Sequence, residues 1–109
     1  MKILLDENLP LALRHEFPGH EIFTVEFMHW KGVKNGRLLA AAAKAGFEVL
    51  LTIDKVMANE QALSDLPLAI LVIDAKSNAL NELHVFVPII LVALNHLKPK
   101  AVTHVNAPS

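Results

Sequence analysis

The chain has 109 residues, 53% of them hydrophobic and 19% charged, which fits one packed domain over residues 1–109 and excludes an intrinsically disordered protein. With a formal net charge of −1 and no cysteine, it has no overall positive field for nucleic acid or lipid, and no disulfide or thiolate chemistry. The N-terminal apolar run is too short for a signal peptide and the longest apolar stretch, Val85–Leu94, too short for a membrane span, so we expect no membrane partner and a cytoplasmic location.

Five short apolar runs rich in Ile, Leu and Val predict strands that are buried on both faces. Turn residues precede most of these runs. The predicted strands are Lys2–Leu5, Glu21–Val25, Val49–Ile53, Ala69–Ile73 and Ala101–Val105.

Helical segments lie between these runs. The predicted helices are Leu9–Phe17 with Asn8 as its N-cap, Asn35–Ala45, a short helix over Val56–Leu63, and a longer helix from about Asn78 to Leu97. Pro88 lies inside the last of these and predicts a kink or a restart there. Alternating strands and helices predict an α/β fold, an open parallel sheet of about five strands with helices on both faces.

An acidic residue directly follows each of the first four runs; these residues are Asp6, Glu26, Asp54 and Asp74. Ligands of open parallel sheets bind outside the carboxyl ends of the strands, so these acids project toward one edge of the sheet. Carboxylates that converge there repel one another unless a cation lies between them. Mg²⁺ or Mn²⁺, which prefers oxygen ligands, is the cation that fits, and the chemistry it implies is phosphodiester hydrolysis.

The same acids have a structural alternative, because Asp often caps the helix that follows a strand. Asp6 and Asp54 are the strongest candidates, since each follows an uninterrupted apolar run and precedes a helical segment. Glu26 has a longer reach from a less apolar run, and Asp74 fits equally well as a turn residue. Spacing alone leaves the metal site and the caps as open alternatives.

Three segments resemble the uncharacterised PIN-like family of small bacterial proteins, which is related to the PIN domain nucleases that include VapC toxins. They are KILLDENLP at residues 2–10, HEIFTV at residues 20–25 and VLLTID at residues 49–54. The resemblance implies a PIN-like fold, an acidic metal site at the strand ends and RNA as substrate. It assigns catalytic and metal-binding roles to Asp6, Asp54 and Glu26, with Asn8 in support.

The chain departs from this family after the third predicted strand. Many relatives have a second acid two residues after the position of Asp54, followed by an aromatic residue. This chain has Asp54-Lys55-Val56-Met57 instead. Loss of that acid would weaken a metal site.

A stretch without acids, from His29 to Lys44, contains Trp30, Lys31 and Lys34. An aromatic residue and several cations beside an acidic site are what a single-stranded RNA channel needs, because bases stack on aromatic rings and cations bind phosphates. We therefore predict that Trp30, Lys31, Lys34 and Lys55 bind substrate. The alternative is a solvated loop and helix edge in which Trp30 packs in the core or at an interface.

The sequence leads to a first hypothesis of a ribonuclease dependent on Mg²⁺ or Mn²⁺, and a toxin partnered by an antitoxin protein is one form of it. A second hypothesis is an inactive PIN-like scaffold that binds other proteins. A third, a response-regulator-like receiver, ranks lower because it needs a Lys after the last strand, whereas Lys100 precedes it. The apolar excess also predicts a homodimer with the Ile89–Leu97 segment at its interface.

Overall fold

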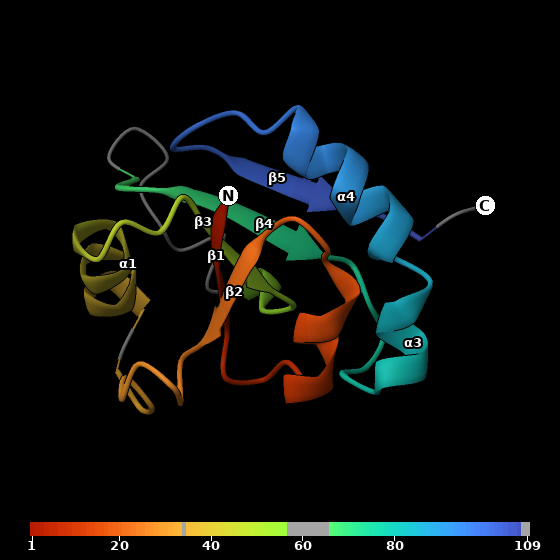
Figure 1. Cartoon of the computed structure of the whole chain (residues 1–109), viewed down its shortest axis with the longest axis horizontal. Helices are drawn as coiled ribbons and strands as arrows, with labels where there is room; N and C mark the ends of the chain where they lie inside the picture. Colours follow the sequence, from red (N-terminus) through yellow and green to blue (C-terminus); the bar gives the residue numbers. More distant parts are fainter. Residues whose placement is uncertain (34, 57–65, 108–109) are drawn as a thin grey trace.

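The computed structural model describes residues 1–33, 35–56 and 66–107, which form an all-parallel sheet with helices on both faces (Figure 1). The strand order is β2-β1-β3-β4-β5. The strands are β1 (Lys2–Leu5), β2 (Glu21–Thr24), β3 (Val49–Thr52), β4 (Ala69–Ile73) and β5 (Val102–Val105). The predicted α/β fold with an open parallel sheet of five strands is confirmed. The predicted bounds are one residue too long for β2 and β3 at their ends, and for β5 at its start.

Successive side chains of the strands fill two separate cores. Leu5 and Leu51 belong to the core on one face, together with Leu13 of the 3₁₀ helix η1 (Leu11–Glu16). Leu4 and Leu50 belong to the core on the other face. Because both faces are covered, the central strands are apolar at nearly every position, which explains why their sequence shows no alternation of polar and apolar residues.

The helices divide between the two faces. Besides η1, the first core contains residues of α3 (Leu80–His84) and α4 (Val87–Asn95), while α1 (Asn35–Lys44) packs on the second. Figure 1 shows α4 and α3 following each other along one side of the sheet, with α1 set apart from them. The restart predicted at Pro88 is confirmed, because α3 ends at His84 and Pro88 lies in the first turn of α4.

The first predicted helix, Leu9–Phe17, is wrong in type and bounds. It is the shorter 3₁₀ helix η1, whose N-cap is Pro10 and not Asn8. The cause is a tight turn after β1, in which the Leu9 N–H donates to the Asp6 carbonyl oxygen at 3.0 Å. Asn8 is therefore part of this turn and does not cap the helix.

Two further predictions concern other parts of the chain. The helix predicted at Val56–Leu63 falls mainly on residues 57–65, outside the described residues. No helix formed by the described residues has the length and apolar character needed to cross a membrane.

Candidate functional site

The strand order reverses between β1 and β3. In the order β2-β1-β3-β4-β5, the chain runs outward in one direction from β1 to β2 and in the other from β3 to β5. Such a reversal is where doubly wound sheets bind ligands, outside the carboxyl ends of the strands. Asp6 begins the loop after β1, and its N–H donates to the Leu51 carbonyl oxygen of β3 at 3.0 Å. Asp6 is thus anchored to both strands at this point.

A buried threonine links the two acids that the sequence analysis ranked highest. The Thr52 hydroxyl donates to the Asp6 carboxylate at 2.7 Å and accepts the Asp54 N–H at 3.0 Å. Thr52 is fully buried at the end of β3, whereas Asp6 and Asp54 are half-buried. A single hydroxyl therefore holds the Asp6 carboxylate and the start of the Asp54 loop in a fixed relation.

The surroundings of Asp6 raise the pKa of its carboxyl above the ordinary value. Burial is the largest cause, and the negative charges of Asp54 and Glu7 add to it. The hydrogen bonds from Thr52 and from the Glu7 N–H, the latter at 2.9 Å, act in the opposite direction. A carboxylate that is partly desolvated and close to other carboxylates is one that a bound cation would stabilise.

A cleft of about 150 Å³ opens beside Asp6. Its lining includes Asp6, Glu7, Glu26 and Lys31, so two of the three predicted acids and one predicted phosphate-binding cation meet here. Asp54 is joined to this group through Thr52 and does not line the cleft itself. The sequence left open whether these residues meet, and the structure brings Asp6, Glu26 and Lys31 to one cleft; their chemical roles stay predictions.

The acids fit a divalent cation only in one way. Among residues 1–33, 35–56 and 66–107, no three His, Asp or Glu side chains are grouped so that all could hold one metal ion. Mg²⁺, however, commonly binds one or two carboxylates and completes its shell with waters and substrate phosphate. Asp6 and Asp54, which are close enough for the charge of one to act on the other, fit that mode.

Asp74 and Lys55 form a second, separate arrangement at the ends of β4 and β3. Lys55 Nζ lies 2.5 Å from Asp74 Oδ1, and both side chains are about half exposed. The hydrogen bond and the charge of Lys55 lower the pKa of Asp74. Lys55, predicted to bind phosphate, is thus paired with an acid of its own chain, and Asp74 lies outside the cleft.

Three predicted site residues remain: Asn8, Trp30 and Lys34. Asn8, predicted to support Asp6, has a buried Oδ1 with no hydrogen-bond partner in the described chain, while its carbonyl oxygen accepts the Asn78 side-chain N–H at 2.9 Å. Trp30 is half-buried and packs edge-on against Phe47 with ring centroids 6.0 Å apart, as the structural alternative requires. Base stacking by Trp30 stays a prediction. Lys34 lies outside the described residues.

Sequence reasoning missed two residues of this site, Thr52 and Glu7. The signal for Thr52 was a hydroxyl at the end of an otherwise apolar run, two residues before Asp54. The signal for Glu7 was its position next to Asp6. Both are polar residues directly beside a predicted acid.

The chain matches no protein-family model, no curated protein and no solved structure. The site is therefore argued from its own geometry.

Proposed function

We propose that the protein is a ribonuclease dependent on Mg²⁺ or Mn²⁺, with Asp6 and Asp54 as the metal-binding carboxylates. The observation that carries this proposal is the bridge from Thr52 to both residues at the point where the strand order reverses. A buried hydroxyl that orients a carboxylate is the kind of support that metal-binding acids have in other proteins. A bound metal would activate a water and offset the charge of a phosphate.

The other residues of the cleft have complementary roles in this proposal. Lys31 offers a cation to a substrate phosphate in a cleft whose other charged lining residues are acids. Glu26 and Glu7 add negative charge that favours the metal-bound state. The buried, unpartnered Oδ1 of Asn8, two residues after Asp6, provides an acceptor for an ordered water or for the metal. A toxin paired with an antitoxin protein, a homodimer through Ile89–Leu97 and a cytoplasmic location remain predictions of this hypothesis.

A second candidate, an inactive scaffold that binds proteins, is favoured by one observation. The described residues contain no group of three metal-binding side chains, so any ion must rely on two carboxylates.

The test is cleavage of single-stranded RNAs of varied sequence by the purified protein, with Mn²⁺, with Mg²⁺ and with a chelator. We expect weak cleavage that requires the metal. Calorimetry should show Mn²⁺ binding to the wild type that is lost in Asp6→Asn and retained in Asp74→Asn, a charge-matched control at another strand end. If no RNA is cleaved under any of these conditions and Mn²⁺ does not bind, the scaffold hypothesis replaces the nuclease.

A further inference from the structure

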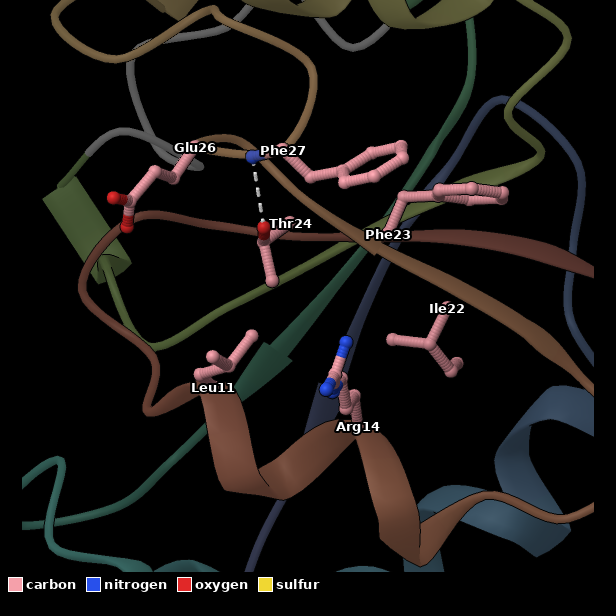
Figure 2. A pocket seen from close by; sticks show the side chains of 7 residues that line it. All are labelled: Leu11, Arg14, Ile22, Phe23, Thr24, Glu26 and Phe27. Atoms are coloured by element: carbon pink, nitrogen blue, oxygen red, sulfur yellow. Dashed lines mark hydrogen bonds between the residues drawn. The ribbon is translucent and has the colours of Figure 1, made fainter.

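A larger pocket lies along the outer edge of β2, next to the acidic cleft. It has a volume of about 360 Å³, which falls in the range of small-molecule sites. Its lining residues come from η1, from β2 and from the turn after β2; they are Leu11, Arg14, Ile22, Phe23, Thr24, Glu26 and Phe27 (Figure 2). Leu11, Thr24 and Glu26 line both this pocket and the acidic cleft. The two spaces therefore adjoin each other and share these three residues.

An exposed aromatic ring forms one wall of this pocket. Phe27 is 65% exposed, and Leu11 in the same lining is 56% exposed. The Phe27 N–H donates to the Thr24 hydroxyl at 3.0 Å, which fixes the turn that carries Phe27. The Phe27 ring lies beside the half-buried Phe23 ring, with centroids 5.5 Å apart. Phe27 thus presents a fixed, open ring on which a planar group can stack.

A cation without an anionic partner forms the opposite wall. In Figure 2 the guanidinium of Arg14 extends from η1 into the space below Thr24 and Ile22. Arg14 is exposed and makes no ion pair or hydrogen bond with any residue in the described ranges. Phosphate is a preferred partner of such a guanidinium, because its planar fork of donors matches phosphate oxygens.

The open edge of β2 adds backbone donors between these two walls. Glu21 and Val25 donate their N–H groups to Met1 and Leu5 on the β1 side. In a parallel ladder the alternate residues Ile22 and Thr24 therefore direct their N–H groups to the free edge. No strand pairs with this edge in the described residues.

We propose that this pocket binds one nucleotide of a single-stranded RNA, the one next to the phosphate held in the acidic cleft. The base stacks on Phe27, the phosphate of that nucleotide binds Arg14, and the strand continues past Thr24 and Glu26 into the cleft. This inference rests on the proposed ribonuclease function, because the wall shared with the acidic cleft is what makes RNA the ligand. A second copy or a peptide strand added to β2 is the competing occupant.

The test is binding of a short, fluorescently labelled oligoadenylate to the full chain in the presence of a chelator, so that no cleavage occurs. We expect Phe27→Leu to weaken binding by roughly five- to a hundredfold, the range for loss of one stacked base. Arg14→Gln should weaken it by roughly ten- to a hundredfold, the range for loss of a hydrogen bond to a charged group. Phe27→Trp should retain binding, because it keeps a ring. Lys98→Gln, which removes an exposed charge in the loop before β5 and outside this pocket, is the control for Arg14 and should leave binding unchanged.

Several outcomes would overturn the inference. One is binding of oligoadenylate that neither Phe27→Leu nor Arg14→Gln alters. A second is a fall in the molecular mass of these variants, measured by light scattering, with RNA binding unchanged. That result would show that the pocket binds a second copy of this chain. A third is binding of free adenosine monophosphate as tightly as the oligonucleotide, which would assign it to a free nucleotide. Binding is measured without metal, so it is independent of cleavage. If RNA binding depends on Phe27 and Arg14 but no RNA is cleaved, only the nuclease proposal is rejected.

Discussion

Two acidic strand ends of the same sheet have opposite electrostatic surroundings. At the end of β1, burial and the nearby charges of Asp54 and Glu7 raise the pKa of Asp6. At the end of β4, the hydrogen bond and charge of Lys55 lower the pKa of Asp74, which is exposed. Both residues follow a buried apolar strand directly. An acid after a strand therefore does not by itself mark a site; the charges on the neighbouring strand end decide its chemistry.

The difference follows from strand order and from one side chain. β1 and β3 are neighbours at the reversal point, and the residue that ends β3 is Thr52, which holds the Asp6 carboxylate without neutralising it. β3 and β4 are also neighbours, but Lys55 extends from the loop after β3 to Asp74. A carboxylate with a hydroxyl partner keeps its charge available to a cation, whereas a carboxylate with a lysine partner does not.

The largest expected effect is on catalysis, and it is tested by comparing the variants Asp6→Asn and Asp74→Asn. Asp6→Asn should reduce metal-dependent RNA cleavage by more than roughly a hundredfold, since even residues that only orient a metal ligand contribute about 10- to 100-fold. Asp74→Asn removes the same charge at the other strand end and should leave the cleavage rate close to that of the wild type. Rates on one RNA under identical metal concentrations compare the two. Equal rates for Asp6→Asn and wild type would remove Asp6 from the metal site.

Thr52 provides the next largest effect, on stability and on the pKa of Asp6. Thr52→Val keeps the shape but leaves the Asp6 carboxylate and the Asp54 N–H without their hydroxyl partner, which should cost about 1–3 kcal/mol of unfolding free energy. The pKa of Asp6 should rise further, because a hydrogen bond that lowers it is lost. Urea unfolding and NMR titration of the carboxyl measure these changes. Thr52→Ser keeps the hydroxyl and should leave the pKa of Asp6 as it is, although it loses a buried methyl.

Thr52 also shows where sequence reasoning succeeds and where it stops. The apolar runs predict burial on both faces for all five strands. This holds for β3 and β4, which are buried at every position, but the edge strands β2 and β5 are only partly buried. Asp6 and Asp54 were predicted from their position after such runs. The link between them through Thr52 could not be predicted, because it depends on β1 lying next to β3, and strand order is a long-range property.

Strand order explains one further difference, a local turn explains another, and a third depends on how η1 and β2 face each other. The pairing of Lys55 with Asp74 requires β3 and β4 to be neighbours, so a local sequence pattern left Lys55 available for phosphate. The helix predicted from Leu9 fails for a local cause, the turn from Asp6 to Leu9 that displaces its start to Leu11. The pocket at the edge of β2 was not predicted, because it joins residues of η1 and β2 that face each other only in the fold.

The pH dependence of stability should differ in sign between the two acids. The folded protein binds a proton at Asp6 more tightly than the unfolded chain does, so without metal the unfolding free energy falls as pH rises from the ordinary carboxyl pKa through the raised one. Above that pH range, the unfolding free energy is lowered by the full cost of holding Asp6 charged in the folded protein. The pKa of Asp74 is lowered in the folded protein. Its charged carboxylate therefore contributes to the unfolding free energy above the ordinary carboxyl pKa, and this contribution is lost as pH falls through the lowered pKa.

Melting temperatures across acidic and neutral pH, measured with a chelator, test this contrast. Asp6→Asn should melt higher than the wild type above the raised pKa of Asp6, and the difference should disappear on acidification. Asp74→Asn should melt at or slightly below the wild type at neutral pH, with the difference lost in acid. An Asp6→Asn variant that melts lower than the wild type at neutral pH would show that the charged carboxylate stabilises the fold, contrary to the arrangement described above.

The smallest expected effect is that of breaking the pair of Lys55 and Asp74. Both side chains are about half exposed, and solvent-exposed ion pairs contribute little, because water and salt screen them and two flexible side chains must be ordered. Lys55→Gln should therefore not change the melting temperature measurably, while the pKa of Asp74 returns toward its ordinary range. A double-mutant cycle with Asp74→Asn isolates the coupling between the two residues. If Lys55 instead binds substrate phosphate, Lys55→Gln will weaken RNA binding as much as Lys31→Gln does; the pairing predicts that Lys31→Gln, at the wall of the acidic cleft, has the larger effect.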